Sequence, residues 1–91
     1  MYSIYSTTQY KRELKKVKKR NLNIDKLDAV VTMLAANDEP LSAQYNDHKL
    51  SGQYEGYREC HIENDWLLIY KKEKNNLILV LTRTGTHSDL F

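Results

Sequence analysis

The chain has 91 residues, of which 41% are hydrophobic and 29% charged, and its formal net charge is +2. This length predicts one domain, residues 1–91, built around a single hydrophobic core. No apolar run approaches the roughly 18 residues of a membrane span, and the N-terminus lacks the apolar stretch of a signal peptide. The single cysteine, Cys60, excludes an intramolecular disulfide. We therefore expect a cytoplasmic protein that has no membrane partner.

The small net charge conceals a local asymmetry. Residues 11–20 carry seven Lys or Arg and one Glu, whereas the rest of the chain has seven basic and eleven acidic residues. A basic block beside a nearly neutral body is typical of proteins that bind a polyanion such as nucleic acid. A solvated Lys-rich helix face would give the same pattern, so charge alone leaves both interpretations open.

The first twenty residues predict a strand and then a helix. Residues 1–5 have the Tyr and Ile content of a short strand. Ser6, followed three residues later by Gln9, matches a capping box and predicts where the helix begins. The apolar stripe of this helix consists of Tyr10, Leu14 and Val17.

A second helix is predicted over residues 24–36, after Asn21 and Asn23, which break the first helix and are candidate caps for the second. Its apolar positions, spaced three and four residues apart, are Ile24, Leu27, Val31 and Leu34. Asn37 suits the helix end, and Pro40 prevents a restart. Residues 38–53 then form an irregular loop, of a length that is usually either disordered or functional.

The remaining residues predict three strands, over residues 57–62, 66–72 and 77–83, with turn-like separators of hairpin length between them. The last two strands are apolar on both faces and should lie centrally in the sheet. The order β-α-α-β-β-β predicts an α+β domain, an antiparallel-rich sheet with a helical hairpin packed on one face.

The polar residues with catalytic potential all lie in the second half of the chain. They are His48, His61, Asp65, Arg83 and His87. The period of two along a strand predicts that Glu59 and His61 share one face of the first C-terminal strand. On the last strand the same alternation puts Arg83 on the side of Leu77, Leu79 and Leu81, whose face is expected to be apolar.

These residue types suit RNA cleavage that uses no metal. Histidine, with an unperturbed pKa of about 6.5, can act as acid or base at neutral pH. Arginine offers a fixed fork of donors to phosphate oxygens. Aromatic residues such as Tyr57, Trp66 and Phe91 could stack on bases. Core packing is the alternative role for an aromatic residue, and we favour it for Trp66 and Tyr70.

Other chemistries fit less well. Three His and one Asp are plausible zinc ligands, but the short ligand spacings typical of zinc sites are absent. Cys60 lies within a predicted strand, without nearby positive charge to lower its pKa, and is better explained as a small core residue. No Gly-rich phosphate-binding loop occurs among the three glycines. We therefore expect no cofactor and no bound metal.

Four sequence blocks resemble the YafQ branch of the RelE superfamily of bacterial toxins. They are D-H-x-L-x-G at residues 47–52, G-Y-R-[DE]-x-H-[IV]-E at residues 56–63, D-W-[IL]-L-I-Y at residues 65–70, and R-x-G-[ST]-H-x-x-L-F at residues 83–91. The combination, in this order, is specific, although each block alone would be weak. The first half of the chain resembles the family only in its pattern of a strand, a basic helix and a second helix.

The resemblance implies a ribosome-dependent mRNA endonuclease that cleaves codons in the ribosomal A site without a metal and so inhibits translation. It also implies a cognate antitoxin, through which alone the toxin would meet operator DNA. By position, His48, His61, Asp65 and His87 match the family's catalytic set. Arg83 matches its phosphate-stabilising arginine, and Phe91 matches its terminal aromatic residue.

The same resemblance, together with the charge pattern, yields a set of expected substrate-binding residues. Trp66 and Phe91 would contact the nucleotide, and the basic helix would lie against ribosomal RNA. The lysines expected to make these phosphate contacts are Lys15, Lys16, Lys18 and Lys19.

Two alternatives stay open at this point. The chain could be a non-catalytic module of the same fold that binds only RNA or an antitoxin. It could also be a small domain whose histidines are incidental, although the complete polar set argues against that.

Overall fold

The structure is a computed structural model of residues 1–91, and it has an α+β fold with one five-stranded sheet. No helix is both long enough and apolar enough to span a bilayer. The elements, with η for a 3-10 turn, are β1 (Ser3–Ser6), α1 (Thr8–Lys19), α2 (Ile24–Ala36), η1 (Ala43–Tyr45), β2 (His48–Lys49), η2 (Gly52–Tyr54), β3 (Arg58–Glu63), β4 (Trp66–Glu73), β5 (Ile78–Gly85) and α3 (His87–Leu90).

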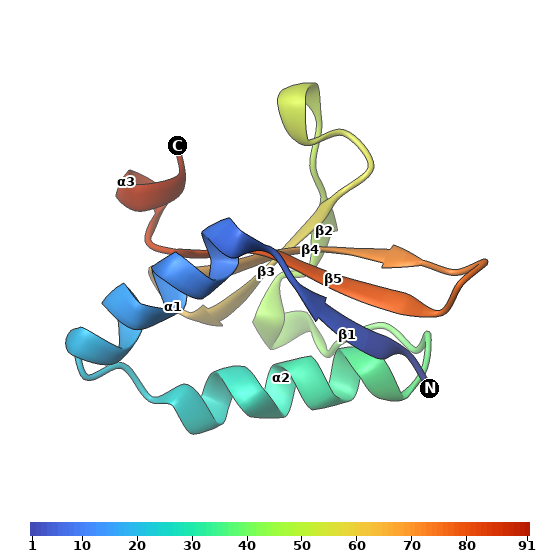
Figure 1. Ribbon diagram of the computed structural model, residues 1–91, viewed down its shortest axis with the longest axis horizontal. Helices are drawn as coiled ribbons and strands as arrows, with labels where there is room; N and C mark the ends of the chain where they lie inside the picture. The colour runs from blue at the N-terminus through green and yellow to red at the C-terminus, as the bar shows by residue number, and fades with distance from the viewer.

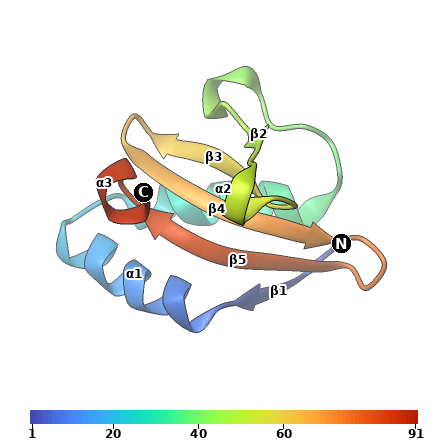
Figure 2. The same cartoon turned by 90° about the horizontal axis from the view of Figure 1, so that it is seen from above.

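The sheet has the strand order β1-β5-β4-β3-β2, which Figure 2 shows from above. Strand β1 runs parallel to β5, and every other neighbouring pair is antiparallel. The predicted fold class is therefore confirmed, with β4 and β5 in the interior of the sheet. The two-residue strand β2 and the four-residue helix α3 at the C-terminus were not predicted.

Helix α2 packs on one face of the sheet, helix α1 lies beside β5 at the edge, and both contribute to the main core (Figures 1 and 2). Helix α2 has the predicted bounds. Its apolar stripe packs against residues of β3, β4 and β5 on the face of the sheet that it covers. Cys60 is fully buried in this core, and burial raises the pKa of its thiol, as expected of a structural cysteine. Trp66 is 2% exposed and donates from Nε1 to Thr84 Oγ1 at 3.0 Å.

The helix starts were predicted with mixed success. Asn23 caps α2 as expected, since its side-chain oxygen accepts the backbone N–H of Asp25 at 3.1 Å. The predicted cap of the first helix, Ser6, is wrong. Ser6 pairs with β5 as the last residue of β1, and Thr7 Oγ1 instead accepts the N–H of Tyr10 at 3.0 Å. Strand pairing fixed the backbone of Ser6, so the next hydroxyl residue became the cap.

A one-residue shift in the β4–β5 register decides which face Arg83 occupies. Tyr70 pairs with Leu81 and Ile69 pairs with Arg83, so Thr82 has no partner on β4. An unpaired residue of this kind reverses the alternation of all residues beyond it. Leu79 and Leu81 lie in the helix-covered core, whereas Arg83 turns to the opposite face. The prediction that these three residues share one side is therefore wrong for Arg83.

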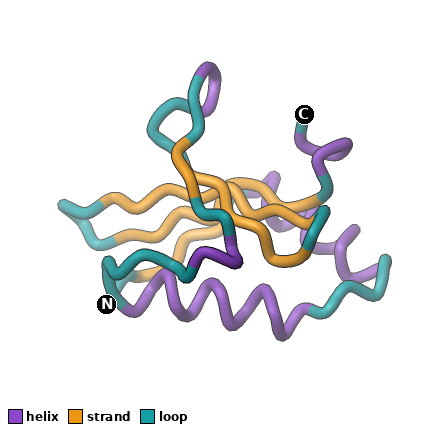
Figure 3. Tube along the Cα trace, turned by 180° about the vertical axis from the view of Figure 1, so that it is seen from behind, coloured by secondary structure: helices purple, strands orange, loops and turns teal.

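Helix α3 and the segment of residues 50–57, which carries η2, stand on that opposite face (Figure 3). A second, smaller core forms beneath them. Its buried members are Leu67, Ile69 and Leu90, with Leu50, Tyr54 and Tyr57 packed against it.

Glu13, a charged residue on the buried side of α1, ties this helix to β5. Its carboxylate, only 6% exposed, accepts hydrogen bonds from Arg83 Nε at 3.1 Å and from the backbone N–H of Thr84 at 3.2 Å. Arg83 donates a second hydrogen bond to this carboxylate from Nη2, so the ion pair between the two residues is bidentate. Burial is tolerated because each carboxylate oxygen has a donor.

Helix α3 is short and is held from two directions. Thr86 and Asp89 form a capping box in which each side chain accepts the other's backbone N–H. Arg20, at the end of α1, donates from Nη1 to Asp89 at 2.7 Å. This arginine is the main cause of a pKa for Asp89 well below the usual range.

The ion pair between Glu13 and Arg83 can be tested by a double-mutant cycle. Glu13→Gln and Arg83→Gln should each lower the free energy of unfolding by about 1–3 kcal/mol, because each leaves a partly buried group without its counter-ion. The double variant should lose less than the sum of the two, by at least about 1 kcal/mol. Urea unfolding of the four proteins gives these values. Additive losses would show that the pair is not coupled.

Asp89→Asn should reduce stability in a pH-dependent way. The lowered pKa means that ionised Asp89 stabilises the folded state above the unfolded-state pKa of about 3.9, and that this stability is lost as the pH falls through the folded-state pKa. The free energy of unfolding of the wild type should exceed that of the variant by about 1 kcal/mol at pH 7, and this difference should shrink below about pH 4. The control is Asp28→Asn, an exposed carboxylate on α2. A gap independent of pH would contradict the assignment.

Candidate functional site

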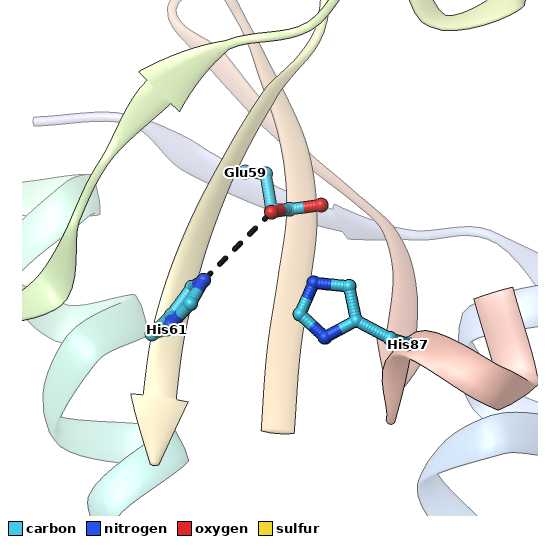
Figure 4. Close-up of side chains that lie close together, drawn as sticks. All are labelled: Glu59, His61 and His87. Carbon is cyan, nitrogen blue, oxygen red and sulfur yellow. Dashed lines mark ion pairs between the residues drawn. The ribbon is translucent and has the colours of Figure 1, made fainter. Parts of the chain in front are cut away.

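Two histidines and a buried carboxylate meet on the face of the sheet that carries α3. Glu59 and His61 lie on the same face of β3, as predicted, and His87 is the first residue of α3 (Figure 4). The Nε2 atom of His61 lies 3.9 Å from Glu59 Oε1, and the His61 and His87 rings have centroids 6.0 Å apart. Glu59 is 4% exposed, so its charge lies beneath the two rings in a setting of low polarity.

His48 approaches the same carboxylate from the neighbouring strand. Its register partner across β2 and β3 is Glu59, and its Nε2 lies 3.4 Å from Glu59 Oε1. Its Nδ1 lies 2.7 Å from the backbone carbonyl of Asn46. A carbonyl can only accept, so Nδ1 carries the proton. Two of the three predicted histidines, His48 and His61, therefore share one buried carboxylate.

Asp65 and His87 form a separate pair at the rim of this cluster. Asp65 Oδ1 lies 3.1 Å from His87 Nδ1 and accepts the backbone N–H of His87 at 3.3 Å. The side-chain bond and then the backbone bond hold the pKa of Asp65 below its usual value. This contact occupies Nδ1, and the other ring nitrogen is turned toward Glu59 in Figure 4. Both side chains are more than half exposed, at 66% and 54%.

Arg83 presents its guanidinium on the same face, between α1 and the segment of residues 50–57. Its Nε and Nη2 bind Glu13, and its Nη1 donates to the hydroxyl of Tyr54 at 3.1 Å. The bonds to Glu13 are the largest cause of its raised pKa. A guanidinium has five N–H groups, and these bonds use three of them. One N–H group therefore remains on Nη1 and one on Nη2. The side chain is 22% exposed, so part of it remains accessible to solvent.

Aromatic rings border the site on its open side. Phe91, 62% exposed, lies with its ring centroid 6.3 Å from that of His87 and 6.0 Å from that of Tyr54. Trp66 does not join them. Although it was predicted to bind substrate, it lies in the core on the opposite face, where its hydrogen bond to Thr84 satisfies the indole. The apolar setting of β4 outweighed its potential for stacking.

The basic block forms the exposed surface of α1. Its lysines Lys15, Lys16, Lys18 and Lys19 are all exposed and make no ion pair within the chain. Because Glu13 and Arg20 connect α1 to β5 and α3, this cationic surface is fixed relative to the histidines.

Three residues of the site were not predicted from the sequence. Glu13 had a signal, because it interrupts the apolar stripe between Tyr10 and Val17 on the same helix face. Glu59 also had one, since it shares the predicted face of His61. Tyr54 had none, because its position depends on how an irregular segment folds back over β5.

Glu59, His61 and His87 could also hold a cation. One ligand atom from each lies within 4.8 Å of the others. Two imidazoles and a carboxylate are a ligand set found in catalytic zinc sites, so the donor chemistry fits a transition metal. The same nitrogens could not transfer protons while they bound a metal.

A separate hollow lies in another part of the structure. It has a volume of about 670 Å³ and lies between the end of α2 and the outer ends of β3 and β4. Asp47 sits in it and accepts from Arg58 Nε at 3.1 Å and from the Tyr70 hydroxyl at 2.8 Å. None of the predicted catalytic residues lines it.

Known proteins resemble this chain in both sequence and fold. Residues 2–91 match the family model described as the bacterial toxin of type II toxin–antitoxin system, YafQ. The mRNA interferase toxin YafQ of Escherichia coli K12 is 45% identical over 83 residues, which cover 91% of this chain and 88% of that protein.

Solved structures agree with this match. The chain superposes on the toxin in the Escherichia coli DinJ-YafQ complex with a TM-score of 0.90 and 40% identity, covering 100% of this chain and 99% of that one. A metal-bound toxin from Helicobacter pylori gives a TM-score of 0.92 and 37% identity, with full coverage of both chains. The chain therefore belongs to the YafQ family of bacterial toxins of type II toxin–antitoxin systems.

Proposed function

We propose that this toxin is an mRNA interferase, an endoribonuclease that cleaves mRNA in the ribosomal A site and thereby inhibits translation. The observation that carries the proposal is the convergence of His61, His87 and Arg83 on one open face of the sheet. The curated relatives named mRNA interferase toxin YafQ, at 45% and 42% identity, support the same activity.

The proposed reaction is attack by the RNA on its own phosphate. A base removes the proton of the 2′-hydroxyl, and the 2′ oxygen forms a bond to phosphorus. The bond from phosphorus to the 5′ oxygen breaks, and an acid returns a proton to that oxygen. The products are a 2′,3′-cyclic phosphate and a 5′-hydroxyl end. Histidines serve both proton transfers, and a fixed cation stabilises the charged phosphate.

The geometry supports a division of these roles. Asp65 holds the proton of His87 on Nδ1, which leaves the other nitrogen, on the side of Glu59, free to exchange a proton with the substrate. His61 and His48 share the Glu59 carboxylate, which stabilises a proton held by either ring. The two free N–H groups of Arg83 bind the phosphate. No step of this scheme requires a metal.

The proposed partners follow from the same surfaces. Phe91 is exposed beside His87 and can stack on a base of the mRNA. We propose that the lysines of α1 contact ribosomal RNA, so that the toxin would act in the cytoplasm with the ribosomes. Relatives form a DinJ-YafQ complex, which supports a cognate antitoxin here, and any contact with operator DNA would be indirect, through that antitoxin.

The alternative is a module of the same fold that binds RNA or an antitoxin without cleaving. The ring pair of His61 and His87 above a buried carboxylate favours the enzyme, because binding alone does not require it.

His87→Ala tests the proposed function. Expression of the wild-type chain without an antitoxin should arrest bacterial growth and produce new mRNA 3′ ends on ribosomes. The variant should relieve both, with cleavage slower by about 10²–10⁴-fold, since it removes one proton-transfer group. Ser88→Ala, at the exposed neighbouring position, is the control and should stay toxic. A wild-type chain that is harmless without an antitoxin would refute the enzymatic proposal.

Neutralising Lys15, Lys16, Lys18 and Lys19 to Gln should weaken ribosome binding at least about tenfold and reduce its salt dependence, because phosphate contacts are lost. The codon that is cut should not change, since these lysines lie on α1, away from the histidines. Sedimentation with ribosomes at several salt concentrations measures the first effect, and mapping of 3′ ends measures the second. Lys26→Gln with Lys74→Gln, which removes two charges instead of four, is the control for loss of positive charge elsewhere on the surface. Unchanged sedimentation of the α1 variant would contradict this role.

A further inference from the structure

Tyr54 holds a fixed position beside the site although it belongs to an irregular segment. It closes η2, which stands with α3 on the same side of the sheet (Figures 1 and 3). Its ring makes edge contacts with Tyr57 and Phe91, each at 6.0 Å between centroids, with interplanar angles of 85° and 81°. Two perpendicular neighbours and the small core beneath leave the ring little freedom.

The hydroxyl of Tyr54 still has a proton to give. It accepts a hydrogen bond from Arg83 Nη1 at 3.1 Å. A phenol oxygen both accepts and donates, whereas a guanidinium only donates. The bond to Arg83 therefore uses a lone pair of Tyr54 and leaves its O–H free. No acceptor within the chain takes that proton in this structure.

The remaining donors of Arg83 point to where such a proton would be used. Glu13 occupies the side of the guanidinium formed by Nε and one N–H of Nη2, and Tyr54 occupies one N–H of Nη1. A phosphate on the two remaining N–H groups lies next to the nitrogen that already contacts Tyr54. Since a phosphate has several oxygens, one can bind Arg83 while another accepts from the hydroxyl.

We propose that Tyr54 is a further catalytic residue, whose hydroxyl donates a hydrogen bond to a non-bridging oxygen of the scissile phosphate. This inference rests on the proposed RNA cleavage and adds a neutral donor to the cation of Arg83. A fixed donor directed at developing charge stabilises the transition state more than the ground state. Phe91 and Tyr57 keep the ring, and thus the donor, in place.

Tyr54→Phe isolates this contribution, because it removes one oxygen and keeps the ring that packs on Phe91. Single-turnover cleavage of ribosome-bound mRNA should slow by about 10–100-fold at saturating enzyme, with little change in the half-saturating concentration. Tyr5→Phe is the matched control. It removes the hydroxyl of a 59% exposed tyrosine on β1 that makes no hydrogen bond to Arg83, and its rate should stay within about twofold of wild type.

Sulfur substitution distinguishes a direct contact from an indirect effect through Arg83. Sulfur is a weaker acceptor, so one of the two phosphorothioate isomers at the scissile position should slow the wild-type enzyme. In Tyr54→Phe, the same isomer should slow cleavage much less than it does in the wild type, because the hydroxyl that binds this oxygen is gone. An equal sulfur effect in both proteins would limit Tyr54 to orienting Arg83 and would overturn the proposal.

The remaining outcomes are also decisive. A wild-type enzyme indifferent to sulfur at both positions, or a Tyr54→Phe rate equal to wild type, overturns the role of Tyr54 and leaves the proposed cleavage intact. A wild-type chain that cleaves no ribosome-bound mRNA overturns both. Thermal unfolding of the two Phe variants at the wild-type midpoint excludes loss of folding as the cause of a slower rate.

Discussion

The site depends on the carboxylate of Glu13, which is buried between α1 and β5. Arg83 turns away from the helix-covered core at the register shift, and a guanidinium in that position would be free to sample many rotamers. Glu13 binds it in a bidentate pair and also accepts the N–H of Thr84, so one side chain fixes both the arginine and the backbone that follows it. The ion pair thereby fixes a cation that keeps two N–H groups without a partner in the chain.

Helix α1 has a second connection to the site through its end. Arg20 pairs with Asp89, which caps α3, and α3 begins with His87. The helix that carries the cationic surface therefore holds both Arg83, the proposed phosphate ligand, and the turn that begins with His87, the proposed proton-transfer residue. The positions of Arg83 and His87 therefore both depend on how α1 packs.

Much of the fold could be predicted from the residues, and the site in part. Helix α2 and the three C-terminal strands followed from apolar periodicity, because each element buries one continuous stripe. The histidines, Asp65 and Arg83 were found from residue type and from the family resemblance. The first helix cap was missed because strand pairing held Ser6. Strand β2 and helix α3 are too short to leave a periodic pattern in the sequence.

The sequence by itself determined the fold class, the basic surface of α1 and the shared face of Glu59 and His61, since these depend on local periods of 3.6 and two residues. Only the tertiary structure decided the face of Arg83, because a single unpaired residue, Thr82, reverses the alternation beyond it. It also decided that Trp66 belongs to the core and that Tyr54 reaches Arg83. Those outcomes depend on contacts between segments distant in the chain, which no local pattern encodes.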